Sequence, residues 1–247
     1  MLKLYFLLTV LLAGEAFATG IEKPLPPMRV IYIPGFGEEP SMFDKIHPHI
    51  AGEKIFVDNW KLLADVTGEG FSATVYAQYL VALFHITNAD VVIGHSLGGW
   101  VAINIKQLTG CRVVQIGSWT DVRRVMPLPI NPKIIYAFTR SGLVFNKLTQ
   151  MMMVKLHYKN QPSKPVFEEV FSNLRTRSKE LVVKQLKLIF NPLHLPVTVS
   201  PELRIHAKAD HIVAYPRTDF VEVPGDHFTL VTHPQPVYNA INDLLQL

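Results

Sequence analysis

Short apolar runs rich in β-branched residues alternate with segments of helical periodicity over most of the chain. The apolar runs predict strands at residues 28–33, 54–57, 90–93, 112–116, 203–206 and 219–223. Apolar residues with helical spacing predict helices at residues 42–50, 71–85, 101–108 and 235–245. Because strands and helices alternate, we expect an α/β domain with a mostly parallel sheet and helices on both of its faces.

The alternation stops between residues 121 and 196, where helical patterns occur without a convincing strand. Helices are predicted there at residues 132–139, 143–156, 165–174 and 179–190. The chain is therefore divided into two parts of one core, residues 19–120 and 197–247, and a helical insertion over residues 121–196. Because the insertion follows the carboxyl end of a strand, it is expected to form a lid over a site at that edge. Its run Met151-Met152-Met153 indicates either an adaptable apolar acyl pocket or ordinary core packing.

Composition and charge narrow the class of protein only a little. The 247 residues are 49% hydrophobic, which suits one α/β domain with an insertion. The formal net charge of +4 is spread without a long run of like charges, so it does not indicate a nucleic-acid partner. The basic groups Arg123-Arg124 and 175–179 are interpreted as solvated faces rather than a subsite for anionic substrate groups. The one cysteine, Cys111, excludes an intrachain disulfide and is expected in the core.

The N-terminal residues have the pattern of a secretory signal peptide over residues 1–18. Lys3 precedes an apolar stretch that is too short to span a bilayer, and Ala16-Phe17-Ala18 has the small-x-small pattern of a cleavage site. Cleavage after Ala18 would export the protein to a periplasm or out of the cell, without a stable membrane anchor. Two alternatives stay open: an N-terminal core helix, or a true start at Met28 that leaves the protein in the cytoplasm.

The segment Gly94-His95-Ser96-Leu97-Gly98 lies between a predicted strand and a predicted helix. This G-x-S-x-G context is typical of a nucleophile elbow, in which a tight turn strains the serine backbone and leaves no room for side chains at the flanking glycines. Ser96 is therefore the candidate nucleophile, and the Leu97 N–H at the helix N-terminus is a candidate oxyanion donor. The alternative is a glycine-rich turn without catalytic function, which could bind phosphate.

A second glycine-containing loop follows the first strand, with the sequence Pro34-Gly35-Phe36-Gly37. Glycines at the carboxyl end of a strand allow close approach of the backbone to a ligand. We expect the N–H of Phe36 or Gly37 to supply the second half of an oxyanion hole. The alternative is a plain turn at the exit of the strand.

A serine nucleophile also needs a base and an acid. Asp210 and His227 follow the last two predicted strands, in the chain order Ser…Asp…His and at the edge of the sheet from which Ser96 projects. His227 is the candidate general base, and Asp210 is expected to orient its ring and stabilise the imidazolium. The alternatives are Asp121 or Asp226 as the acid, and His206, His211 or His233 as the base. A metal site made by His206, Asp210 and His211 is not favoured, because their spacing matches no zinc pattern.

Four segments together resemble the α/β-hydrolase superfamily, and they span most of the chain after the predicted signal peptide. They are residues 34–37, 94–99, 209–213 and 225–228, with the sequences PGFG, GHSLGG, ADHIV and GDHF. The resemblance implies an acyl-serine intermediate and neither a metal nor an organic cofactor. The chain departs from the family's pattern in three respects: the usual first two strands are missing, the segment between Asp210 and His227 is short, and Pro34 stands where many relatives have histidine.

The leading functional prediction is a serine hydrolase that cleaves a carboxylic ester or thioester of a small-molecule or acyl substrate. An amide, lactone or carbon–carbon bond would use the same triad, and the fold does not decide among them. An apolar lid on an exported protein also suits an interfacial lipase. The alternative from another class is a non-catalytic protein that holds an apolar ligand. The oligomeric state and the acyl length stay open.

Overall fold

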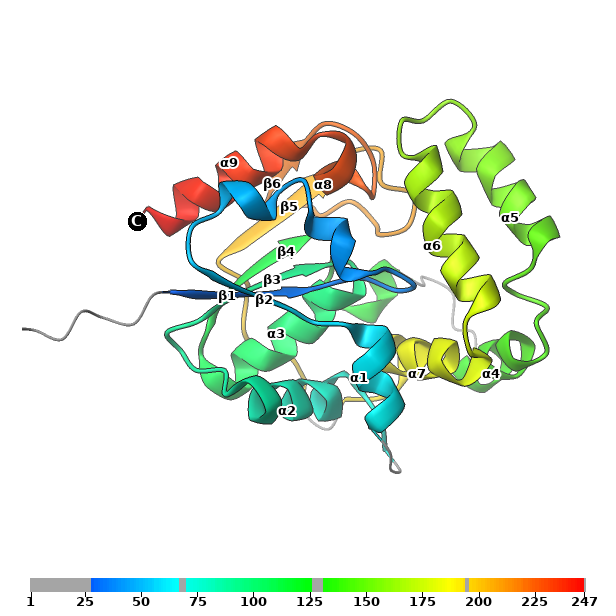
Figure 1. Cartoon of the computed structure of the whole chain (residues 1–247), viewed down its shortest axis with the longest axis horizontal. Coiled ribbons are helices and arrows are strands. Elements are labelled where there is room, and N and C mark those ends of the chain that lie inside the picture. The colour runs from blue at the N-terminus through cyan, green and yellow to red at the C-terminus, as the bar shows by residue number, and fades with distance from the viewer. Residues whose placement is uncertain (1–27, 67–69, 126–130, 194–195, 247) are drawn as a thin grey trace, which may run out of the picture.

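Six strands form one parallel sheet in the computed structural model, which describes residues 28–66, 70–125, 131–193 and 196–246. The strands are β1 (Arg29–Ile33), β2 (Glu53–Phe56), β3 (Val91–His95), β4 (Arg112–Ile116), β5 (Leu203–Ala207) and β6 (Val221–Val223). Their order across the sheet is β2-β1-β3-β4-β5-β6 (Figure 1). This arrangement confirms the predicted parallel α/β class. The predicted signal peptide, residues 1–18, lies outside the described residues.

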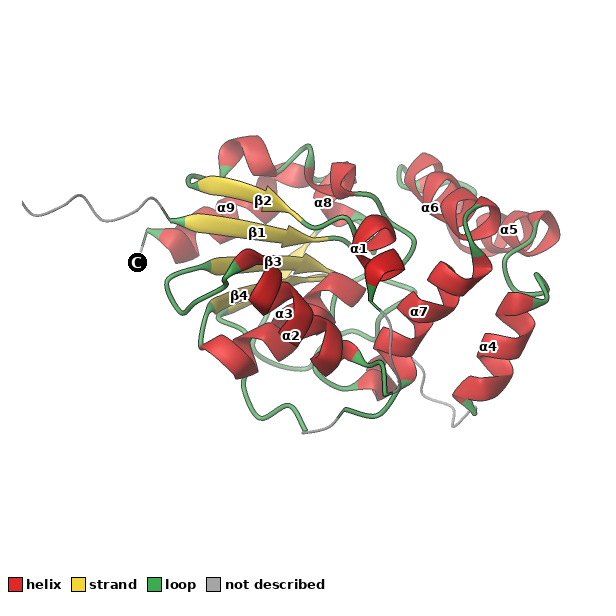
Figure 2. Cartoon of the chain, turned by 60° about the horizontal axis from the view of Figure 1, so that its bottom comes forward, coloured by secondary structure: helices red, strands yellow, loops and turns green. Residues whose placement is uncertain are grey.

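Helices cover both faces of the sheet, as the alternating pattern predicts. On one face lie α2 (Ala73–Phe84) and α3 (Leu97–Thr109), and on the other lie α8 (Thr229–Thr232) and α9 (Pro234–Leu245) (Figures 1 and 2). Every residue of β3 is buried, because that strand is central and covered on both sides. The burial of β3 explains why its first four residues, 91–94, are all apolar rather than alternating with polar ones.

Helices α4 to α7 leave the core between β4 and β5. They comprise α4 (Pro132–Arg140), α5 (Lys147–Met153), the π-helical turn η4 (Val154–Tyr158), α6 (Lys164–Thr176) and α7 (Lys179–Phe190). Figure 2 shows them grouped beyond the carboxyl ends of the strands. The helix predicted at residues 143–156 begins later than expected, because the Asn146 side chain and Thr149 form a capping box that starts α5 at Lys147. We call α4 to α7 the helical insertion.

Two local predictions near the N-terminal half differ from the structure. The helix predicted at residues 42–50 is two short 3-10 helices, η1 (Pro40–Phe43) and η2 (His47–His49). Pro48 lacks an N–H and restricts the residue before it, so a continuous α-helix cannot run through this segment. The sequence pattern also missed α1 (Asn59–Asp65), a helix of seven residues whose first turn is capped by Asp58 through the Lys61 N–H. Such a short helix shows little periodicity, so the cap is the stronger signal.

Candidate active site

Ser96 occupies a strained turn between β3 and α3. Its φ and ψ are 51° and −119°, a combination that a residue with a side chain rarely adopts. The Ser96 N–H donates to the Ile116 carbonyl at 2.9 Å, and its carbonyl accepts from the Ser118 hydroxyl at 2.7 Å. These bonds to β4 and the residues after it hold the turn, and the backbone geometry is the one predicted for a nucleophile elbow.

Gly94 and Gly98 are required by the close packing of backbone in this turn. A Cβ at Gly94 would lie 2.3 Å from the Gly98 carbonyl carbon, and a Cβ at Gly98 would lie 1.9 Å from the Ile33 carbonyl oxygen. Both distances are far inside van der Waals contact, and the obstructing atoms are backbone that cannot rotate away. The predicted steric reason for the two glycines is therefore confirmed.

The substitution Gly98→Ala is expected to cost more than about 4 kcal/mol of folding free energy, because β1 and the elbow would have to separate. Gly142→Ala is the control, since nothing lies within 4 Å of a Cβ there and only its φ of 78° is unfavourable. The control should lose about 1–2 kcal/mol. Urea denaturation of both variants measures the difference, and equal losses would contradict the packing argument.

His227 and Asp210 meet at the carboxyl edge of the sheet. His227 Nδ1 lies 2.8 Å from Asp210 Oδ2, and Asp210 Oδ1 accepts the N–H groups of Ile212 and Val213 at 2.8 and 2.9 Å. The connection from β5 to β6 runs through residues 208–220 without a helix. The short segment noted in the sequence is therefore long enough to join the two strands. Because β5 and β6 are adjacent and parallel, the loops that follow them start side by side.

Opposing effects act on the pKa values of this pair. Burial disfavours the imidazolium of His227, but the charge and hydrogen bond of Asp210 outweigh burial and raise the pKa of His227 above 6.5. Burial also opposes ionisation of Asp210, yet the interactions with His227 and with the Val213 N–H lower the pKa of Asp210. Asp210 is therefore held as a carboxylate, beside an imidazole that readily accepts a proton.

The structure places the alternative acids elsewhere. Asp121 binds Arg123 near the surface, through contacts of 2.6 to 3.1 Å. Asp226 lies next to His227 in sequence but accepts hydrogen bonds from the Ser163 hydroxyl and the Phe228 N–H. The two carboxylates are thus occupied by other partners, and Asp210 is the acid that reaches a histidine of this site.

The alternative bases are also accounted for. His206 is buried in β5, with Nε2 3.3 Å from the Val213 carbonyl and 3.6 Å from Asp210 Oδ2. Burial lowers the pKa of His206, so it is kept neutral beside the acid. His233 contacts the Thr232 hydroxyl at 2.9 Å, and His211 is exposed.

Ser96 and His227 both line one apolar cavity of about 240 Å³. The core supplies Phe36, Ile212 and Phe228 to its wall, and the helical insertion supplies six further side chains. These six are Phe145, Met153, Phe167, Val170, Phe171 and Leu174. Of the three methionines singled out in the sequence, Met153 lines the cavity, whereas Met151 and Met152 are 60% and 53% exposed.

Two backbone N–H groups are available to face an oxyanion at Ser96. Leu97 is the first residue of α3, and the N–H groups of a first helical turn have no partner within their helix. The Phe36 N–H has no partner among the hydrogen bonds of the described residues. The Gly37 N–H, in contrast, donates to Gln185 Oε1 at 2.9 Å. Of the two residues predicted for this role, Phe36 is therefore the available donor and Gly37 is engaged by the helical insertion.

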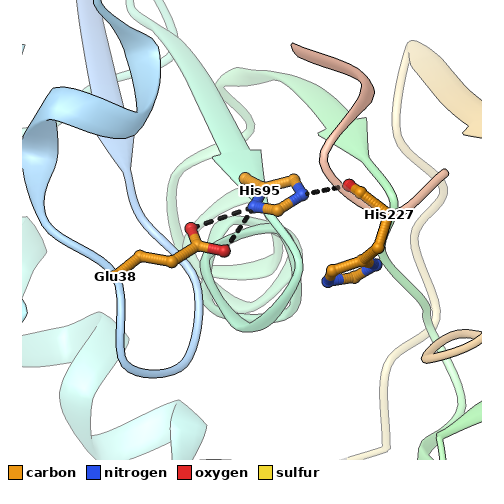
Figure 3. Close-up of side chains that lie close together, drawn as sticks. All are labelled: Glu38, His95 and His227. Atoms are coloured by element: carbon orange, nitrogen blue, oxygen red, sulfur yellow. Dashed lines mark hydrogen bonds and ion pairs between the residues drawn. The ribbon is translucent and has the colours of Figure 1, made fainter. Parts of the chain in front are cut away.

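Glu38, His95 and His227 form a buried network that the sequence pattern did not reveal (Figure 3). His95 Nδ1 lies 2.8 and 2.9 Å from the two Glu38 carboxylate oxygens, and Nε2 lies 2.8 Å from the His227 carbonyl oxygen. Glu38 Oε2 also accepts the Gly35 N–H. Because a carbonyl can only accept, His95 Nε2 donates to the His227 carbonyl, and Nδ1 faces the Glu38 carboxylate. The network ties the loop after β1 to the elbow and to the loop of His227.

The same three residues are the one group of potential metal ligands found among the described parts of the chain. Their ligand atoms lie within 4.8 Å of one another. Both ring nitrogens of His95 are already hydrogen-bonded, so a cation would have to displace Glu38 or the His227 carbonyl. These groups are therefore better accounted for as hydrogen-bond partners of one another than as ligands of a bound metal.

Comparison with known proteins identifies the fold. No protein-family model matches the sequence, and no curated protein matches it either. The fold is similar to a hydrolase from Oleispira antarctica (12% identity, TM-score 0.65, 89% of this chain and 91% of that chain covered). It is also similar to a peroxisomal α/β-hydrolase from Saccharomyces cerevisiae (16%, 0.57, 89% and 76%) and to a thermophilic esterase from Thermogutta terrifontis (17%, 0.60, 90% and 90%). The chain therefore has the α/β-hydrolase fold, which confirms the resemblance drawn from its sequence motifs.

Proposed function

We propose that this protein is a serine hydrolase that cleaves carboxylic esters or thioesters of apolar acyl groups. The observation that carries the proposal is the 2.8 Å contact between His227 and Asp210, beside a cavity that Ser96 also lines. A strained nucleophile elbow and a buried His–Asp pair have no evident structural use together. The esterases among proteins of this fold support the same chemistry, although fold by itself does not choose a reaction.

The reaction follows from the roles of these groups. His227 Nε2 accepts the Ser96 proton while Oγ attacks the acyl carbon, and the Leu97 and Phe36 N–H groups stabilise the oxyanion. His227 then protonates the leaving alkoxide or thiolate, which departs and leaves an acyl-serine. A water molecule, deprotonated by His227, attacks this ester, and the carboxylic acid is released with Ser96 restored. Asp210 keeps the His227 ring in the tautomer that both steps need.

The wall of the cavity supports an apolar acyl group as the part of the substrate that is recognised. Apart from Ser96, His227 and Glu38, every residue that lines it is apolar. The Glu38 carboxylate is occupied by His95 and the Gly35 N–H, so it offers little to a charged substrate. Each methylene buried in such a cavity contributes about 0.8 kcal/mol, or about fourfold in kcat/KM, until the cavity is full.

A fluorophosphonate probe tests the central assignment, because it labels only an activated serine. We expect one labelled peptide, containing Ser96, and loss of labelling when a p-nitrophenyl ester competes. Labelling that is absent, or that falls on another serine, would favour a binding protein without catalysis.

N-terminal sequencing of the exported protein separately tests the proposed cleavage after Ala18. An intact Met1 would exclude this cleavage.

Shortening Phe145 is expected to move the acyl preference toward longer chains. Its ring lies 5.6 Å from the rings of both Phe36 and Phe171, at the side of the cavity formed by the helical insertion. Phe145→Ala should therefore lengthen the chain at which kcat/KM is highest in a series of p-nitrophenyl esters. Phe138→Ala is the matched control, since Phe138 is 50% exposed in the same insertion. An unchanged preference in Phe145→Ala would place the acyl group elsewhere.

A further inference from the structure

Exposed apolar side chains gather on the outside of the helical insertion. Of the eleven large hydrophobic residues that are exposed in the described parts of the chain, seven lie between Ile134 and Leu156. Six of these are on helices: Ile134 and Phe138 on α4, Leu148, Met151 and Met152 on α5, and Leu156 on η4. The four on α5 and η4, Leu148, Met151, Met152 and Leu156, belong to one continuous helical segment, and we call these four the outer apolar surface. A concentration of exposed apolar side chains is unusual on the surface of a soluble protein and is typical of an interaction site.

The same segment is basic and contains no acid. From Val122 to Phe167 the sequence has eight lysine and arginine residues and no aspartate or glutamate. The eight are Arg123, Arg124, Lys133, Arg140, Lys147, Lys155, Lys159 and Lys164. Lys133, Lys147, Lys155 and Lys159 are exposed and form no ion pair with another described residue. Three acids from outside the segment pair with basic residues in it: Asp121 with Arg123, Glu180 with Arg140 and Glu168 with Lys164.

The outer apolar surface lies opposite the cavity that contains Ser96. Leu148, Met151, Met152 and Leu156 recur with the spacing of a single helix face. Met153 and Phe145, on the other side of the same segment, line the cavity. Both views of the fold show α4 and α5 at the outer end of the molecule, beyond the sheet (Figures 1 and 2). A partner on this surface would therefore meet the protein directly above the cavity.

We propose that the outer apolar surface docks on an anionic phospholipid surface. The leucine and methionine side chains would enter the interface, and Lys147, Lys155 and Lys159 would contact the headgroup phosphates. No helix among the described residues is long and apolar enough to cross a bilayer. This docking would place the proposed hydrolase at a lipid surface. It concerns lipid binding alone and does not depend on catalysis by the protein.

Charge argues against a second copy of this chain as the occupant. In a two-fold dimer the same patch faces itself, so Lys147, Lys155 and Lys159 would face the same three lysines of the other copy. Glu168 is the one acid that lines the same hollow as these three lysines, and it pairs with Lys164, so the patch keeps a positive charge. An anionic lipid surface supplies the opposite charge together with an apolar layer, and it thus complements both properties of the surface.

An environment-sensitive fluorophore attached at Met152→Cys tests the proposal directly. The full-length chain is titrated with vesicles of equimolar phosphatidylcholine and phosphatidylglycerol, and with vesicles of phosphatidylcholine alone. We expect a blue shift and an intensity increase with the mixed vesicles, and a much weaker response with phosphatidylcholine. The label at Leu83→Cys is the matched control, because Leu83 is 44% exposed on α2, and Cys111 is buried and stays unlabelled. No response at Met152→Cys, or equal responses at both positions, overturns the proposal.

The basic residues are tested by neutralising two of them. Lys155→Gln with Lys159→Gln should raise the lipid concentration for half-maximal response about ten- to thirtyfold, because each such lysine adds about a factor of five. Lys45→Gln with Lys208→Gln, exposed lysines outside the insertion, should have no effect. Equal affinities of the two double variants overturn the proposal. A stable dimer in sedimentation velocity that dissociates in Leu148→Ser with Met152→Ser would also overturn it, since a second copy would then cover the surface.

Discussion

Replacing Ser96 with alanine is expected to lower kcat for a p-nitrophenyl ester by about 10⁴- to 10⁶-fold, the loss typical of a removed nucleophile. Residual turnover would reflect the oxyanion donors and the binding of the acyl group. The fold should be unaffected, because the Ser96 hydroxyl makes no hydrogen bond among the described residues and alanine fits the same space. Steady-state kinetics and a thermal melt of the same preparation measure the two effects separately.

The matched control for this experiment is Ser41→Ala, an exposed serine in η1. Its activity and Tm should equal those of the wild type. If Ser96→Ala retained turnover, hydrolysis would have to use another nucleophile, and the proposed function would be wrong. If it lost turnover together with its fold, the loss would be structural, and the melt distinguishes the two cases.

The substitution Asp210→Asn is expected to lower kcat by about 10⁴-fold through the tautomer of His227. The introduced amide would keep its oxygen toward the Ile212 and Val213 N–H groups, so its NH₂ group would point at His227 Nδ1. An amide N–H forces Nδ1 to accept, which leaves the proton on Nε2. That nitrogen could then no longer take the Ser96 proton. The geometry of the site would be preserved while its chemistry is lost.

The pH dependence of the residual activity checks the same assignment. The base must be neutral, so kcat/KM of the wild type should rise with pH through the pKa of His227, above 6.5. Asp210 is the main cause of the raised value, so Asp210→Asn should move this midpoint to lower pH. The other groups that face His227, Glu38 and Asp226, are unchanged in the variant.

Asp121→Asn is the control for the acid, because Asp121 follows β4 and is one of the two alternative acids that the sequence offers. It binds Arg123 near the surface, so its replacement should leave both kcat and the pH midpoint unchanged. A large loss in Asp121→Asn, with near-normal activity in Asp210→Asn, would reverse the assignment of the acid.

Much of the fold could be predicted from local patterns. The strands that become β1, β3 and β4 are mostly apolar rather than alternating, because both faces of a central parallel strand are buried. The elbow could be predicted because this turn leaves no room for a side chain at Gly94 or Gly98, so any sequence that forms it needs glycine there. The sequence pattern merged η1 and η2 into one predicted helix and missed α1, since short helices contain too few residues to show a period.

The candidate site could be predicted in part. Asp210 and His227 follow β5 and β6, and the chain order of a known motif singles them out. Glu38 and His95 carry no such signal, because a glutamate in a loop and a histidine between glycine and serine are ordinary in isolation. Likewise, nothing local separates Phe36 from Gly37, since the choice depends on Gln185, 148 positions away.

By itself, then, the sequence determined most of the succession of strands and helices and the glycine-flanked turn at Ser96, and it favoured Asp210 and His227 over the other acids and histidines. These depend on neighbouring residues, or on the rule that loops after parallel strands share one edge. Only the tertiary structure decided which acid and histidine meet, which oxyanion donor is available, that Glu38 and His95 form a pair, and which side of α5 faces the cavity. Each of these depends on contacts between segments far apart in the chain, and periodicity along one segment contains no information about its partner.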